Sequence, residues 1–240
     1  MASDKSAPGL LPTGVLKIDA HSTSANTLAF GLLGFATQVT FIGLLGTGLI
    51  EPAGAALVFT FFVVTGVLQL VIAGVHLVGK NNLLACTAMV TFGGYVTSIG
   101  LFQLLVMSDT IKVGGPIKDS LTAMFTLYAY ITFMCMVATL KTNLANVINF
   151  FGVFVMFALS AAGSHTESPA VNLAAAWVGL FTGISAYYSA SAVFLGEFFE
   201  YPVLPVGDLS RFWNRKSAAA RGIQRHMSEA TIFVSSEVEA

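Results

Sequence analysis

The side chains best suited to chemistry in this sequence are a few amides and hydroxyls that recur every three or four residues. Residues with this spacing lie on one face of a helix. The clearest series begins with two amides one turn apart, Asn146 and Asn149, and continues through Val153 and Met156 to Ser160. Amides and hydroxyls donate and accept hydrogen bonds, so such a face could replace the water around a small polar solute.

Four other segments carry a comparable face. Gln38 lies on one of them and Gln69 on another, and most of the remaining polar positions are hydroxyls. The four series are Gly31, Phe35, Gln38 and Ile42; Gly66, Gln69, Ala73 and His76; Thr87, Thr91, Tyr95 and Ser98; and Thr182, Ser185 and Ser189.

Two interpretations of these faces are open. Small and hydroxyl-bearing residues let membrane helices pack closely and bond across their interface, and packing is the simpler explanation for most single positions. The amides are harder to explain in this way, because a deep amide is costly unless it faces protein or water. Together they favour a passage lined by polar groups, and they are Gln38, Gln69, Asn146 and Asn149.

The segments that must position these faces are long and apolar. Hydrophobic residues make up 55% of the 240-residue chain and charged residues only 10%, against about 25% charged residues in a soluble domain. A helix needs about 20 mostly apolar residues to cross a membrane. The pattern predicts an all-α membrane protein with six transmembrane helices, at roughly 28–50, 55–79, 83–107, 120–140, 144–163 and 172–196.

Basic residues beside these segments indicate their orientation, because cytoplasmic loops of membrane proteins carry an excess of Lys and Arg. Six crossings place both termini on one side, which would hold Lys80, Lys141 and the five basic residues of 211–225. The other side would hold only Lys112 and Lys118. We therefore expect both termini in the cytoplasm, with a cytoplasmic segment 1–27, a membrane domain 28–200 and a cytoplasmic tail 201–240.

His76 is the ionisable residue that lies inside a predicted span rather than beside a break between spans. It lies about one turn before Lys80, near the predicted cytoplasmic end of its helix. The first interpretation is an interfacial side chain whose ring reaches the membrane surface. The second is a proton relay, because an unperturbed histidine titrates near neutral pH.

Several function classes are excluded by what the spans lack. No span carries a mid-helix Lys, Arg, Asp or Glu, and a proton pump or voltage sensor needs such residues. The phosphate-binding, zinc-protease and serine-hydrolase motifs are absent as well. The sequence therefore predicts no enzyme, no cofactor, no metal site and no nucleic-acid partner. A passive or proton-coupled path for a small solute remains, in a protein whose expected partners include membrane lipid.

A series of short motifs runs through nearly the whole of 26–207, almost without gaps. It begins at 26–35 with Asn-Thr-Leu-Ala-Phe-Gly-Leu-Leu-Gly-Phe and ends at 204–207 with Leu-Pro-Val-Gly. Between them lie 69–74, 80–82 with Thr87-Ala88, 92–95, 139–143, 157–159 and 186–188. In order and spacing these pieces resemble the acetate uptake transporter family, which groups bacterial succinate–acetate permeases with fungal acetate permeases and ammonia-export proteins.

The resemblance implies a fold and a function. The expected protomer has six helices around an hourglass path, and six protomers assemble as a hexamer in the membrane, which we expect to be the plasma membrane. The expected solute is acetate or another small monocarboxylate. A small anion must shed water to pass a ring of apolar side chains, and amides and hydroxyls on either side could replace that water.

The resemblance also assigns site residues. The family's path narrows at three apolar side chains, which fall here on Phe35, Phe92 and Val153, and Ala186 matches a position linked to substrate size. The resemblance and the helix faces together predict that the substrate path includes Asn26, Gln38, Gln69, Thr87, Thr91, Tyr95, Asn146, Asn149, Ala186 and Tyr188.

This chain departs from the family pattern in places that affect its substrate. Thr27 and Ala29 replace both prolines of the opening motif, Phe92 replaces an aromatic hydroxyl, and Val153 replaces a bulkier aliphatic residue. Two alternatives stay open at this point. The same fold could export ammonium or ammonia, because amide carbonyls suit a cation as well as amide NH₂ groups suit an anion. A dry bundle could also serve as a membrane scaffold or sensor without transport.

Overall fold

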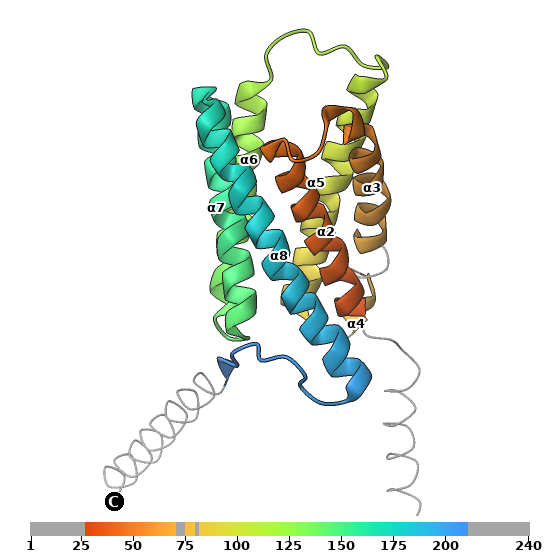
Figure 1. Cartoon of the computed structure of the whole chain (residues 1–240), viewed down its shortest axis with the longest axis vertical. Coiled ribbons are helices and arrows are strands. Elements are labelled where there is room, and N and C mark those ends of the chain that lie inside the picture. The colour runs from red at the N-terminus through yellow and green to blue at the C-terminus, as the bar shows by residue number, and fades with distance from the viewer. Residues whose placement is uncertain (1–26, 71–74, 80–81, 211–240) are drawn as a thin grey trace, which may run out of the picture.

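The computed structural model describes residues 27–70, 75–79 and 82–210. Residues 1–26 of the predicted N-terminal segment and residues 211–240 of the predicted tail lie outside the described part. The described residues form a helical bundle with one isolated β-bridge, between Asn143 and Asp208 (Figure 1). The elements are α2 (Thr27–Thr47), η1 (Pro52–Gly54), α3 (Ala55–Leu68), α4 (Val75–Gly79), α5 (Leu83–Met107), α6 (Lys118–Thr139), α7 (Leu144–Thr166) and α8 (Pro169–Phe199).

Five of the six predicted spans are single helices, and all five are long and apolar enough to cross a membrane. The predicted span 55–79 is only partly covered, because residues 71–74 lie outside the described residues. In the structure α3 ends at Leu68, Gln69 and Leu70 form a π-helical turn, and α4 begins at Val75. The sequence on both sides of the π-helical turn is equally apolar, so hydropathy could not reveal that turn. A π-turn shifts the helical phase, and it often marks a functional site.

Close helix contacts fix the bundle at positions that only glycine can occupy. The most extensive packing joins α2 to α8, α6 to α7, α7 to α8 and α3 to α5. A Cβ on Gly43 of α2 would lie 2.5 Å from the backbone nitrogen of Leu180 in α8. A Cβ on Gly66 of α3 would lie 2.7 Å from the carbonyl oxygen of Gly93 in α5. In a membrane the hydrophobic effect does not drive helices together, so close van der Waals contact between backbones stabilises their association instead.

The two ends of the bundle differ. Helices α2, α5 and α7 begin at one end, where α8 ends, and we call this the inner end; it lies at the bottom of Figure 1. The loop 108–117 lies at the opposite, outer end. At the inner end Asn82 and Asn143 cap α5 and α7 by accepting hydrogen bonds from the backbone of Ala85 and Asn146. Each cap satisfies an N–H group that the helix itself cannot pair.

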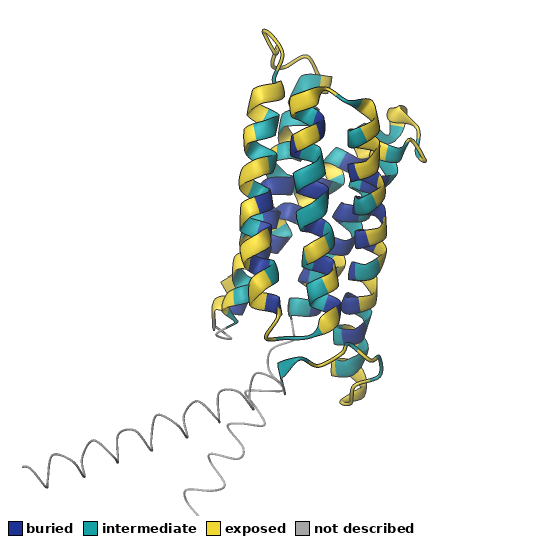
Figure 2. Cartoon of the chain, turned by 90° about the vertical axis from the view of Figure 1, so that its left-hand side faces the viewer, coloured by how far each residue is buried: buried dark blue, intermediate teal, exposed yellow. Residues whose placement is uncertain are grey.

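Burial separates a lipid-type exterior from a dense interior. Figure 2 shows buried residues gathered on the inward faces of the helices and exposed ones on the outside. Many exposed side chains are large and apolar, including Leu57, Leu83 and Phe181. An exterior of this size and apolarity is unfavourable in water and suits hydrocarbon. The interior cluster includes Phe35, Phe92 and Val153, so the three predicted constriction residues lie in the core.

Candidate functional site

A small apolar cavity lies in the interior of the bundle. Phe35, Phe92 and Val153 all line it, from α2, α5 and α7. These helices start together at the inner end, and the three residues lie at similar depth, about 12–14 Å along the helix axes. The cavity measures about 10 Å³, so it holds at most about one water molecule. Its other lining residues are Gln38, Val39, Ile42, Tyr95, Val96, Met156 and Phe157.

Aromatic neighbours hold the Phe92 ring in place. Its centroid lies 5.6 Å from that of Phe35, 6.2 Å from that of Phe150 and 6.4 Å from that of Phe157. Ring pairs at these separations are favourable in tilted and offset arrangements. The Phe157 ring also meets Tyr95 at 5.2 Å. The cavity is therefore bounded by side chains that have little freedom to move aside.

Buried amides lie on both sides of this cavity. Gln38 is one turn from Phe35 toward the outer end, and its Nε2 donates to Thr65 Oγ1 at 2.8 Å. Asn149 is one turn from Val153 toward the inner end, and its Nδ2 donates to Ser189 Oγ at 2.7 Å. Both amides are buried, with 1% and 4% of their surface exposed.

Gln69 is the third buried amide, and it lies at the π-turn that ends α3. Its Nε2 donates to the carbonyl oxygen of Gly31 in α2 at 3.0 Å. Its oxygen, like those of Gln38 and Asn149, is buried and has no hydrogen-bond partner among the described residues. A buried polar atom without a partner is costly, so three such oxygens in the interior of the bundle call for an explanation.

The hydroxyls of Ser98 and Thr182 behave differently from the buried amides. Ser98 Oγ donates to the carbonyl oxygen of Gly94, and Thr182 Oγ1 donates to that of Val178. These bonds stay within one helix, where each residue pairs with the residue four positions earlier. Such hydroxyls have their hydrogen-bond partner within their own helix and need none on a neighbouring helix. For Ser98 and Thr182 the packing interpretation is therefore the better one, whereas the amides bond between helices.

A wide vestibule opens at the inner end. It has a volume of about 600 Å³ and includes Asn146 and Ser189. Ser189 also accepts the hydrogen bond from Asn149, so the vestibule extends to a direct neighbour of that buried amide. Val153, which lines the dry cavity, lies one turn further along α7. Among the described residues, the charged ones that line the vestibule are Glu197 and Glu200. Its other lining residues are Asn143, Ala192, Val193, Gly196, Tyr201, Pro202, Leu204 and Val206.

The segment 201–209 forms part of the vestibule wall and is tied to α7. The backbone nitrogens of Leu144 and Ala145 donate to the carbonyl oxygens of Gly207 and Val206, at 2.8 and 3.1 Å. Tyr188 Oη donates to the carbonyl oxygen of Pro205 at 2.6 Å. The bonds from Leu144 and Ala145 satisfy the first N–H groups of α7, which the helix leaves unpaired. The segment therefore holds a fixed position at the inner mouth.

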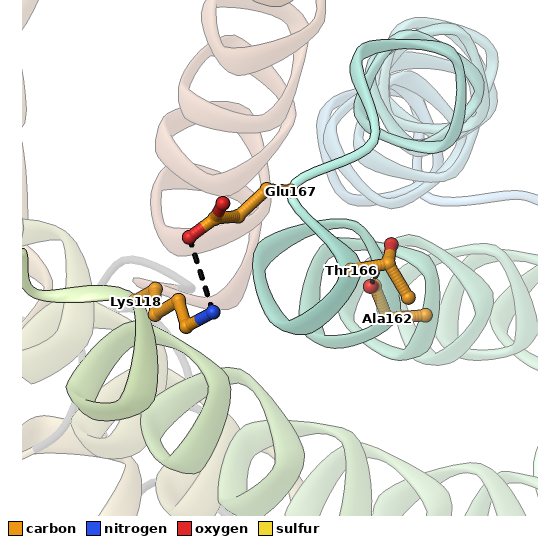
Figure 3. A network of polar contacts seen from close by, with 4 residues as sticks. All are labelled: Lys118, Ala162, Thr166 and Glu167. Carbon is orange, nitrogen blue, oxygen red and sulfur yellow. Dashed lines mark hydrogen bonds and ion pairs between the residues drawn. The ribbon is translucent and has the colours of Figure 1, made fainter.

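The outer end carries a smaller cavity of about 410 Å³, between the ends of α6, α7 and α8. Lys118 and Glu167 line it and form an ion pair, with Nζ and Oε1 3.2 Å apart (Figure 3). Thr166 beside them donates to the carbonyl oxygen of Ala162 (Figure 3). Both charged side chains are well exposed, so the pair contributes little to stability. It places one charge of each sign at the outer mouth.

Comparison with known proteins identifies the family. Residues 9–211 match the GPR1/FUN34/yaaH family. The chain belongs to this family. The similarity to SatP, the Succinate-acetate/proton symporter of Escherichia coli, is 29% identity over 184 residues, which cover 77% of this chain and 96% of that protein. An uncharacterized protein of Methanothermobacter thermautotrophicus is 26% identical over 187 residues, 76% of this chain and 91% of that protein.

A solved structure extends the family match to three dimensions. The bacterial acetate channel SatP superposes with a TM-score of 0.70 at 28% identity, covering 77% of this chain and 99% of that chain. The expected resemblance to acetate transporters and the expected helical membrane fold are therefore confirmed. The relatives with a stated activity carry transport or channel names.

The predicted path residues of this family member fall into two groups. Tyr95 lines the dry cavity, Asn146 lines the vestibule, and Ala186 is fully buried in the same core cluster as Phe35. Thr91 is half-buried, whereas Thr87 and Tyr188 are exposed and line none of the three cavities described. Asn26 lies outside the described residues. The structure thus brings together the constriction residues and the amides, but not Thr87 or Tyr188.

His76 lies at the inner end and is half-buried. Its Nδ1 lies 3.1 Å from Thr27 Oγ1, which ties α4 to the start of α2. His76 lines none of the three cavities described. This placement favours the interfacial interpretation over a proton relay.

Sequence reasoning placed Ser189 on a polar helix face, but it did not assign the neighbours of the amides and of Phe92 to the site. Thr65 fixes Gln38, Ser189 meets Asn149, and Phe157 supports the ring of Phe92. Thr65 lies four residues before Gln69, and Phe157 lies four after Val153. Helical spacing from residues already chosen could have found both. Nothing in the sequence pairs Ser189 with Asn149.

Proposed function

We propose that this protein passes acetate, or a similar small monocarboxylate, across a membrane through the dry cavity. The observation that supports this most directly is the arrangement of Phe35, Phe92 and Val153 around a cavity of about 10 Å³, with buried amides on both sides. Apolar rings of this kind gate by excluding water. The relatives named for succinate and acetate supply the solute class.

Other functions have less support. No observation favours ammonium export or a scaffold without transport, and the named relatives are carboxylate transporters. A dry constriction also needs no reaction chemistry, and among the described residues no cluster of His, Cys, Asp and Glu could hold a metal ion. The proposal therefore includes neither an enzyme activity nor a cofactor.

Flux through purified protein in liposomes tests the proposal. Uptake of labelled acetate, succinate and ammonium is compared with uptake into protein-free liposomes. We expect protein-dependent acetate flux that exceeds that of succinate and ammonium, because the narrow cavity disfavours a larger dicarboxylate. Acetate uptake equal to that of protein-free liposomes would contradict the proposal. Ammonium flux without acetate flux would support the ammonium alternative.

Topology is a further part of the proposal. Lys141 lies at the inner end, between α6 and α7, and it belongs to the side that the basic residues assign to the cytoplasm. The inner end should therefore face the cytoplasm, and both termini should lie there. Cysteines introduced at Ser108 or Thr166 are expected to react with an impermeant thiol reagent in intact cells, and cysteines at Asn82 or Ser217 are not. Ser217 lies outside the described residues. External labelling at Asn82 would reverse the orientation.

Assembly as a hexamer in the plasma membrane completes the proposal. The apolar exterior of the bundle suits lipid and also suits neighbouring protomers, because large side chains such as Phe181 and Phe198 are exposed on it. The family resemblance supplies the number six. Native mass measurement in mild detergent is expected to show six protomers. A monomer that is fully active after dilution would refute the hexamer.

A further inference from the structure

Met156 is the flexible member of the wall around the dry cavity. It lies on α7, one turn from Val153 toward the outer end, and it is 4% exposed. The other described wall residues are aromatic or branched, except Gln38, whose amide is held by its hydrogen bond to Thr65. Methionine is unbranched and rotates about several side-chain bonds, so it adapts to the space around it. Among the wall residues, Met156 is therefore the one whose conformation can most easily change the width of the cavity.

Gly179 of α8 provides the space into which the Met156 side chain extends. A Cβ on Gly179 would lie 2.9 Å from Met156 Sδ and 3.6 Å from its Cγ. The next atom, Cα of Gly43 in α2, would lie 3.9 Å away, which is ordinary van der Waals contact. A methyl group at this position would therefore displace the end of one flexible side chain and leave the packing of α8 against α2 in place.

The next glycine of α8 has a different role. A Cβ on Gly183, one turn further along the helix, would lie 2.7 Å from the backbone nitrogen of Thr40 in α2. A backbone atom cannot move aside as a side chain can, so Gly183 is needed for the close contact between the two helices. No described backbone atom of another helix would come as near to a Cβ on Gly179. Close approach of the helices therefore does not explain why residue 179 lacks a side chain.

We propose that Met156 sets the size limit of the constriction, and that Gly179 is the positioning residue that keeps the methionine side chain out of the dry cavity. The Met156 side chain lines the cavity and also lies against Gly179. The cavity is the open space beside it in an interior that is otherwise closely packed, so a side chain displaced from Gly179 moves toward the cavity. This inference rests on the proposed function and concerns which monocarboxylates the same path admits.

The fluxes of two solutes that differ by one methylene group test this inference. Labelled acetate and propionate are measured on the same proteoliposomes, and uptake by protein-free liposomes is subtracted. Met156→Ala shortens the side chain and should raise the propionate-to-acetate flux ratio about tenfold, since one methylene group in an apolar pocket gives discrimination of about this size. Gly179→Ala pushes the methionine side chain inward and should lower the ratio by a similar factor.

A double variant and two controls separate positioning from a general effect on packing. With Met156→Ala in place, the methyl group of Gly179→Ala has no side chain to displace, so the double variant should show the ratio of Met156→Ala alone. Met89 is also 4% exposed, but it lines none of the three cavities described, so Met89→Ala should lower the melting temperature and keep the wild-type ratio. A Cβ on Gly94 would have no described neighbour within 4 Å, so Gly94→Ala should also keep that ratio.

A folded Met156→Ala or Gly179→Ala protein with the wild-type ratio would overturn the inference, and so would a double variant whose ratio is as low as that of Gly179→Ala. Met156→Val replaces Met156→Ala if that variant folds poorly. If Gly179→Ala alone does not fold, the double variant should fold, and its failure to do so would overturn the positioning role. In each case wild-type acetate flux persists and the proposed function survives. Absence of any acetate uptake by the wild-type protein would instead refute the proposed function, and with it this inference.

Discussion

Proteoliposomes with Phe92→Ala are expected to show a succinate-to-acetate flux ratio at least about fivefold above that of the wild type. The reason is that widening a gate that works by excluding water lowers its barrier to a larger solute. Phe92 lies between Phe35 and Phe157 in the wall of the dry cavity. Removal of its ring opens the narrowest section to water and to a larger solute. Labelled succinate and acetate, measured on the same preparation, give the ratio directly.

A second buried phenylalanine provides the control. Phe62 is 1% exposed and belongs to the same core cluster as Phe92, but it does not line the cavity. Each alanine variant should lose about 3–5 kcal/mol of stability, as large core truncations do, and their melting temperatures should fall alike. Only Phe92→Ala should change the flux ratio. If both variants kept the wild-type ratio, Phe92 would be a packing residue and not part of a gate.

The conservative change at this position should behave differently. Phe92→Tyr keeps the ring and adds a hydroxyl, which the family pattern places at this point of the path. We expect folding to be preserved and the flux ratio to stay near the wild-type value, because the width of the constriction is unchanged.

Val153→Phe is expected to reduce the flux of every solute by more than about tenfold, because a closed apolar ring blocks water and polar solutes. Val153 is 1% exposed and lines a cavity of only about 10 Å³. The larger ring must fill that space completely. Overpacking of a core costs about 1–3 kcal/mol, so the protein should still fold. Acetate uptake and melting temperature, measured together, check both statements.

Val58→Phe is the matched control for this closure. Val58 is 3% exposed in α3 and is part of the same core cluster, but it is not in the wall of the dry cavity. It should lower the melting temperature to a similar degree and leave most of the acetate flux. Acetate flux that survives in folded Val153→Phe would show that the solute takes another route.

Several features of the fold could be predicted from the sequence because they depend on composition along one helix. Charged residues interrupt the apolar runs at 51, 80, 109–119, 141 and 165–167, and no helix can bury these charges in hydrocarbon. The ends of five helices therefore fall close to the predicted limits. The π-helical turn at Gln69 and Leu70 escaped prediction because the apolar run continues through it.

The candidate site was only partly predictable for a similar reason. Spacing and resemblance assigned Phe35, Phe92 and Val153, and these three do share one cavity. The same reasoning placed Thr87 and Tyr188 on the path, but both are exposed. Helical spacing shows which residues share a face of a helix. It does not show whether that face contacts another helix, a cavity or the exterior of the bundle.

The sequence by itself determined the membrane environment, the helices and the family, because each depends on residues that are near one another in the chain or follow a known order. Only the tertiary structure decided that the NH₂ group of Gln38 meets Thr65, which leaves its oxygen without a partner among the described residues. The Thr65 hydroxyl of α3 donates its hydrogen to the carbonyl oxygen of Phe61 in the same helix. It can therefore only accept a hydrogen bond from Gln38 of α2. Hydrogen-bond direction arises from partners on different helices, and their meeting is a property of the packed bundle.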